Sequence, residues 1–116
     1  MAGPPFESRT SVITCDTQGI VQEYAADAAD LFGWTQDEVI GKMSVAMFHV
    51  PKNVPTLVPR LLREALEKGK FEEEVTLMRK DGARFPAVLT VRPMFRDGTQ
   101  IGYMGRTRPL GPPKKP

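Results

Sequence analysis

The chain of 116 residues contains one cysteine and one histidine, and its formal net charge is only +2. A single cysteine cannot form an intrachain disulfide, which fits a reducing cytoplasm. No apolar run approaches the roughly 20 residues of a membrane-spanning helix, and residues 1–5 lack the features of a signal peptide. Basic residues are scattered apart from Lys114 and Lys115, so nucleic acid is not expected as a partner. We therefore expect one small cytoplasmic domain without membrane contact.

Signatures of catalysis and of metal binding are also missing. Ser8, Ser11 and Ser44 lack the context of a nucleophile elbow, and no recognisable motif would orient the histidine. No cluster has the Cys/His spacing of a metal site. The glutamates at 72–74 lie on an expected strand, where side chains alternate between faces, so we interpret them as a solvated edge. The sequence therefore predicts a protein that is not an enzyme.

The two ends of the chain differ in composition from its middle. Residues 1–9 and 109–116 are rich in Pro and Gly, which do not sustain regular pairing. We interpret them as an N-terminal flank and a Pro/Lys-rich tail or linker around one folded domain at 10–108. Such a domain suits one module of a longer protein.

Short elements are expected in the first half of the domain. The pattern predicts strands at 11–15 and 20–24 and helices at 25–32 and 36–40. Gly33 suits the left-handed C-cap of the first helix. Thr35 with Glu38 three residues later forms a capping box for the second.

The segment 53–68 has the clearest helical periodicity. Its apolar residues recur every three or four positions and form one stripe: Val54, Leu57, Val58, Leu61, Leu62, Ala65 and Leu66. Pro59 removes a backbone donor and costs about 3 kcal/mol inside a helix. We therefore expect the regular helix to begin near 56–59, after a looser turn at 53–56, and to end at Gly69.

Three further strands are expected at 71–78, 85–91 and 101–106, with turns at Asp81-Gly82 and at 96–98. Alternation places these residues on core-facing sides: Val75, Leu77, Ala87, Leu89 and Val91. Together with the first hairpin, these strands form a five-stranded antiparallel sheet. Short helices and one longer helix pack on one face of it, which is an α+β fold.

Two segments resemble the signature segments of PAS domains. The first is Leu-Phe-Gly-Trp-Thr-Gln-Asp-Glu-Val-Ile-Gly at 31–41, and the second is Arg-Lys-Asp-Gly-Ala-Arg-Phe-Pro at 79–86. Further matching residues are Asp16, Gly19, Gly69, Phe71, Glu74, Gly98 and Gly102. The resemblance covers nearly all of 10–108 and implies the PAS fold and a sensory module.

The chain departs from the family pattern at two places. Ala25 stands where the family often has an Asn that opens the first short helix, so a local hydrogen bond is missing. Arg-Thr-Arg-Pro at 106–109 stands where Asp-Ile-Thr often closes the last strand and couples to a downstream coiled coil. Since Pro109 stops a continuous helix, helical output is either absent or begins later.

The resemblance implies a signal-transduction module that binds a small ligand or a partner domain. It would regulate a linked kinase, cyclase or chemoreceptor, including two-component regulation. Two alternatives stay open: a haem-based O₂ sensor, and a ligand-free PAS domain for dimerisation or protein contact. We expect a homodimer through apolar or neutral residues on the far face of the sheet, with Phe6 in the flank.

His49 is the candidate axial ligand of haem b, because PAS domains include haem-based gas sensors. The family often carries His-Pro here without a cofactor, so the other interpretation is a polar residue at the mouth of a loop. Oxygen sensors of the family place the ligand His on the long helix, and 53–68 contains none. Flavin is not expected, because 42–52 lacks the photosensor cysteine; Cys15 is interpreted as a small buried strand residue.

A small, mostly apolar cavity is expected between the long helix and the sheet. Its predicted lining is Met43, Phe48, His49, Val58, Leu61, Leu62, Leu77, Leu89 and Met104. The methionines at 43, 47, 78, 94 and 104 are interpreted as fillers of irregular core space. Trp34 should pack at the core edge, with its N–H reaching a partner or water.

Overall fold

The computed structural model describes residues 10–115. The strands are β1 (Ser11–Cys15), β2 (Val21–Tyr24), β3 (Phe71–Met78), β4 (Arg84–Arg96) and β5 (Thr99–Pro109). The α-helices are α1 (Ala26–Phe32), α2 (Gln36–Val39) and α3 (Val54–Lys68). Two 3₁₀ helices, η2 (Val45–Phe48) and η3 (Pro51–Asn53), precede α3.

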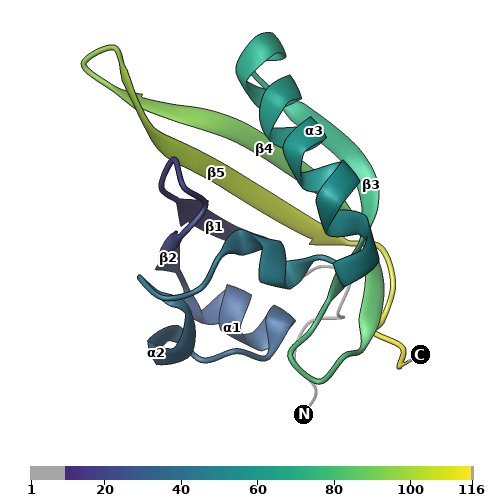
Figure 1. The fold of residues 1–116 in the computed structure, drawn as a ribbon. Helices are drawn as coiled ribbons and strands as arrows, with labels where there is room; N and C mark the ends of the chain where they lie inside the picture. The colour runs from purple at the N-terminus through teal and green to yellow at the C-terminus, as the bar shows by residue number, and fades with distance from the viewer. Residues whose placement is uncertain (1–9, 116) are drawn as a thin grey trace.

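The five strands form one antiparallel sheet in the order β2-β1-β5-β4-β3. The last strand lies in the centre, so the helical segment crosses from one edge of the sheet to the other. Figure 1 shows the helices on one face of the sheet, and the β4–β5 hairpin extending beyond them. The hairpin turns at Asp97 and Gly98, whose φ of 51° and 81° suit a two-residue turn. The predicted α+β fold and its topology are confirmed.

Alternation along the strands separates a buried face from an outer face. Buried residues on the helix-covered face include Ile13, Cys15, Phe71, Val75, Leu77, Phe85, Ala87, Leu89, Val91 and Tyr103. This pattern confirms the faces predicted for β3 and β4. The helical segment adds Phe48, which lies 4.6 Å from Phe32 and is stacked on Tyr24 at 5.9 Å, measured between ring centroids.

The predicted helix signals of the first half are confirmed. Gly33 is left-handed at φ 83°, and its N–H donates to Ala29 O at 2.8 Å, which ends α1. Thr35 Oγ1 accepts from Glu38 N, while the Glu38 carboxylate accepts from Thr35 N, so the capping box of α2 is complete. α1 starts after Ala25 with no side-chain cap, as the departure from the family pattern predicted.

The predicted start of the long helix is wrong. α3 begins at Val54, directly after η3, and contains Pro59. Pro55 stands in the first turn, where its missing N–H has no intrahelical partner to lose. Pro59 removes one backbone hydrogen bond, and burial of Leu61 and Ala65 by the helix offsets that loss.

The last strand is longer than predicted. β5 continues to Pro109, which is paired with Ala87 of β4. Further on, Lys114 and Arg84 exchange two backbone hydrogen bonds of 2.7 and 2.8 Å. Proline keeps its carbonyl, and Lys114 keeps its N–H, so this segment can still pair in places. Leu110 N also donates to Pro86 O at 2.8 Å, so the expectation that 109–116 lacks regular pairing is wrong at Pro109, Leu110 and Lys114.

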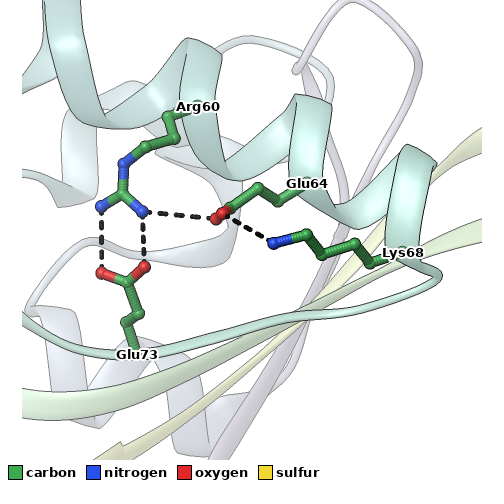
Figure 2. A network of polar contacts seen from close by, with 4 residues as sticks. All are labelled: Arg60, Glu64, Lys68 and Glu73. Atoms are coloured by element: carbon green, nitrogen blue, oxygen red, sulfur yellow. Dashed lines mark hydrogen bonds and ion pairs between the residues drawn. The ribbon is translucent and has the colours of Figure 1, made fainter.

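A polar network holds α3 against the edge strand β3 (Figure 2). Arg60 Nη2 donates to Glu73 Oε1 at 2.9 Å, and Arg60 Nη1 contacts Glu64 at 3.3 Å. The Arg60 guanidinium also lies 5.5 Å from the ring centroid of Phe71. Lys68 completes the network with Glu64 at 3.3 Å. Glu72 and Glu74 are exposed, as predicted for a solvated edge, whereas the partly exposed Glu73 is paired with α3.

Trp34 packs against the core as predicted, and Lys80 Nζ lies 5.1 Å from its ring centroid. Its Nε1 is buried and has no hydrogen-bond partner among the described residues. Met43 packs against the core, as expected of a filler. Met47 and Met104 are 42% and 37% exposed, so neither fills core space as predicted.

Candidate functional site

A cavity of about 60 Å³ lies between the helices and the sheet. Its wall is formed by Ile13, Cys15, Phe32, Val45, Phe48, His49, Leu61, Leu62, Leu77, Leu89, Val91, Tyr103, Gly105 and Thr107. Most of these side chains are apolar. A single water needs roughly 10–15 Å³ on this measure. The cavity therefore has room for a few waters or one molecule of a few heavy atoms.

The structure brings six of the nine predicted site residues to this wall: Phe48, His49, Leu61, Leu62, Leu77 and Leu89. Met104 lies on the outer face of the sheet, because its neighbours Tyr103 and Gly105 occupy the inner positions of β5. Met43 packs on the core away from the cavity, and its backbone pairs with Val21. Val58 is half-buried, one helical turn before Leu61, and does not reach the wall.

Sequence reasoning missed the contribution of β5, namely Tyr103, Gly105 and Thr107. Their spacing of two residues carries the signal, but the prediction placed Met104, which lies on the opposite face of this strand, at the cavity. Gly105 matters most, because it has no side chain to fill the space. A Cβ built there would lie 3.8 Å from Ile13 O and 3.9 Å from Leu89 Cδ1, which is ordinary contact. The missing side chain at Gly105 therefore contributes part of the cavity.

His49 is the most unusual polar group at the cavity. It follows η2, its backbone N–H donates to Ala46 O at 3.1 Å, and the residue is only 6% exposed. Burial lowers the pKa of His49 to about 4, so the imidazole is neutral at pH 7. Its Nδ1 is buried and has no hydrogen-bond partner among residues 10–115. A buried polar atom of this kind is costly unless something supplies a partner.

Cys15 and Ser11 on β1 are also buried. Burial raises the pKa of the Cys15 thiol, so the thiol stays protonated and unreactive at neutral pH. Ser11 is 1% exposed and stands opposite Thr107, which lines the cavity. The Ser11 hydroxyl oxygen has no partner in the described part of the chain.

The surroundings of His49 do not fit haem b. Pockets for drug-sized ligands span roughly 300–1,000 Å³, whereas this cavity has about 60 Å³. An iron-ligating imidazole also requires a hydrogen-bond acceptor for its second nitrogen. Nδ1 of His49 has no such acceptor within residues 10–115. The cavity beside His49 is thus too small for the haem b that His49 was predicted to bind as an axial ligand.

The far face of the sheet carries a second hollow, of about 520 Å³. It is lined by Thr10, Glu72, Val88, Thr90, Arg92, Met104, Arg106 and Arg108. Four of these residues are charged and the other four are apolar or neutral, so the prediction of apolar or neutral residues there is right only in part. The predicted homodimer through this face stays a prediction. Phe6, the other part of that prediction, lies outside the described residues.

Two negative findings apply to residues 10–115. No group of three or more His, Cys, Asp or Glu side chains is placed to hold a metal ion. No helix in this range has the length and apolar character needed to cross a membrane.

Comparisons with known proteins agree with the geometry. The family model for the PAS fold matches residues 7–110. A curated relative, two-component system protein A of Emericella nidulans, is 28% identical over 100 residues, which is 86% of this chain and 15% of that protein. The chain thus spans a small fraction of the relative's length.

Solved structures show the same fold. A PAS domain from Colwellia psychrerythraea superposes with a TM-score of 0.83 at 21% identity, covering 90% of each chain. A second match is the PAS domain of a LuxR-family transcriptional regulator from Burkholderia thailandensis, solved in complex with ethanol. It superposes with a TM-score of 0.73 at 14% identity, and the match covers 87% of this chain and 88% of that one. The match of the family model over most of the sequence, together with this architecture, shows that the chain belongs to the PAS family.

Proposed function

We propose that this chain is the sensory module of a larger signalling protein, and that a small molecule in the cavity is its input. The observation that carries the proposal is the unpartnered Nδ1 of His49, a residue that lines a mostly apolar cavity. A cavity lined only by apolar groups can stay empty, because no polar atom in its wall is left without a hydrogen bond. A buried imidazole nitrogen without a hydrogen bond gains free energy when a ligand supplies one.

The chemistry of the wall indicates a neutral ligand with an apolar body and one hydroxyl group. In a neutral imidazole one nitrogen donates and the other accepts, and a hydroxyl can do both, so it pairs with His49 in either tautomer. A charged molecule would lose its hydration among side chains such as Leu61 and Leu89 without an ionic partner. The complex of the Burkholderia thailandensis PAS domain with ethanol supports a ligand of this size.

The output would lie in a linked domain. The curated relative is a two-component system protein of which this chain spans 15%, which supports a module coupled to a kinase, with a cyclase or chemoreceptor as alternatives. Such a module would work in the cytoplasm. A ligand-free PAS domain that mediates only protein contact is the competing function.

The test is a titration with 1-propanol, followed by ¹H–¹⁵N correlation spectra of the full chain. Residues at the cavity, such as Leu77 and Gly105, should shift and saturate, with a dissociation constant of about 1 mM for a ligand this small. Propionate, which has the same chain length but is charged, should produce no saturating shift at these residues.

Two variants assign the effect. Gly105→Ala adds a methyl group without a clash and should weaken binding by about tenfold while leaving the fold intact. His49→Phe keeps an aromatic ring but removes the polar partner, and should weaken propanol by a similar factor. No saturating shift in the wild-type protein, for any small alcohol, would favour the contact-only function.

A further inference from the structure

The hollow of about 520 Å³ lies on the face of the sheet opposite the cavity, and three arginines line it. Arg92 belongs to β4, whereas Arg106 and Arg108 belong to β5. Thr90 is paired with Arg106, so Arg92 stands diagonally across from Arg106, and Arg108 stands two positions along β5. Such neighbours lie about 7–8 Å apart, within reach of long side chains. The three guanidinium groups can therefore reach one molecule in the hollow.

Within residues 10–115, none of these exposed arginines forms an ion pair. Their partners in the register of β1, β4 and β5 are all neutral, namely Val12, Val88, Thr90 and Met104. Opposite charges across strands stabilise a sheet, whereas like charges this close repel each other. A bound anion would replace that repulsion with attraction.

One acid lines the same hollow, and it is already engaged. Glu72 accepts a hydrogen bond from Thr90 Oγ1 at 2.9 Å and lies 3.7 Å from Lys70 Nζ. The Thr90 hydrogen bond, together with Lys70 and Arg92, holds the pKa of the Glu72 carboxyl below its usual range, so this group is charged at neutral pH. Three guanidinium groups against one carboxylate give the lining a formal charge of +2. The hollow therefore favours a ligand that carries more than one negative charge.

We propose that this hollow binds the diphosphate group of a free small molecule, such as a nucleoside diphosphate. A guanidinium donates two parallel N–H groups to the oxygens of a phosphate. Three neighbouring guanidinium groups match two adjacent phosphates, with Arg106 in the middle shared by both. A ligand with a single carboxylate would leave at least one guanidinium unpaired.

The rest of the lining suits the uncharged part of such a molecule. Val88 and Met104 supply apolar contact, and the Thr10 hydroxyl can donate a hydrogen bond. The volume of about 520 Å³ lies within the range of roughly 300–1,000 Å³ for small-molecule sites, so there is room for more than a diphosphate. A hollow between side chains accommodates a free molecule better than the headgroup of a lipid that stays in a flat bilayer.

Glu72 opposes a bound anion, because its carboxylate lines the hollow. Glu72→Gln removes this negative charge and keeps the size of the side chain, so it should tighten diphosphate binding by about threefold at low salt. Glu67→Gln changes the net charge equally at an exposed position of α3 and should leave binding unchanged. An equal gain from both substitutions would mean that only the net charge of the protein attracts the anion.

The experiment is calorimetric titration of the full chain with inorganic pyrophosphate and with ADP, in about 50 mM salt and without divalent cations. Both should bind 1:1 with a dissociation constant of about 0.1 mM, and inorganic phosphate should bind about tenfold more weakly. Arg106→Gln should weaken pyrophosphate binding by about tenfold or more. Arg63→Gln removes the same charge from an exposed position of α3 and should bind like wild type.

Spectra locate the bound molecule. In ¹H–¹⁵N correlation spectra, pyrophosphate should shift the amide signals of Thr90 and Arg106, but not that of Leu61 at the cavity. Circular dichroism checks that each variant is folded. Four results would each overturn the proposal: no saturable binding of either diphosphate, equal binding by wild type and Arg106→Gln, sulfate binding as tight as that of pyrophosphate, or binding only to vesicles that contain a bisphosphorylated phosphoinositide.

Discussion

The guanidinium of Arg60 on α3 joins the carboxylate of Glu73 on β3 through two hydrogen bonds, and the same guanidinium covers the ring of Phe71. This contact attaches the helix to the edge of the sheet, next to Leu61 and Leu62, which form part of the cavity wall. The helix that closes the cavity is thus held by a partly exposed polar contact.

Breaking that contact should cost little stability. Because Arg60 and Glu73 are 38% and 41% exposed, Glu73→Gln should lower the free energy of unfolding by about 0.5–1 kcal/mol, and salt should reduce the difference. Urea denaturation at two salt concentrations measures this. Glu67→Gln, an exposed position on the same helix, is the control and should change nothing. Equal effects of both substitutions would mean that the contact contributes nothing specific.

His49 should make stability dependent on pH. Its pKa is about 4 in the folded protein, against about 6.5 when unfolded. Below pH 6.5 the unfolded chain binds a proton that the folded chain does not, so stability present above pH 6.5 is lost as the pH falls towards 4. The full difference is worth about 3 kcal/mol.

The measurement compares wild type with His49→Phe by urea denaturation between pH 7 and pH 4. Carboxylates titrate in both proteins, so the change in their difference isolates His49. The variant should become relatively more stable by about 3 kcal/mol at the acidic end. Parallel pH profiles would show that the imidazole is solvated in the folded protein.

Gly102 should not tolerate any side chain. A Cβ at this position would overlap the backbone carbonyl oxygen of Cys15, where β1 approaches β5. Gly102→Ala should therefore lower the free energy of unfolding by about 3 kcal/mol or more, because β1 and β5 must separate. Thermal and urea denaturation give the value.

Gly69 provides the matched control for that substitution. It has φ of 80°, but no described atom lies within 4 Å of the place its Cβ would take. Gly69→Ala should cost about 1–2 kcal/mol from backbone conformation alone. A similar loss at both glycines would mean that β1 and β5 can move apart cheaply.

Local signals were readable in the sequence because they act over a few residues. The capping box of Thr35 and Glu38 needs a spacing of three, and Gly33 needs only its own φ. Alternation in β3 assigned Val75 and Leu77 to the core, since a strand places every second residue on one face. The matched segments at 31–41 and 79–86 then supplied the fold and the family, which the family model supports.

What required the tertiary structure was the relation between residues far apart in the chain. The side of β5 that faces the core depends on its pairing with β1 and β4, so Met104 was assigned to the cavity and Tyr103 was missed. α3 accommodates Pro59 because its packing on the sheet offsets a lost hydrogen bond, and no local rule measures that balance.

The cavity and the arrangement of charges on the outer face of the sheet both depend on the tertiary structure. A missing side chain at Gly105 becomes a cavity only because Ile13, Leu89 and the helices close around it. The sequence determined which residues are basic and which are acidic, but the register of three strands decided that Arg106 and Glu72 lie on either side of Thr90. The order of residues determines local features such as helix caps and turns, whereas cavities and surface patterns arise when the sheet brings distant segments into register.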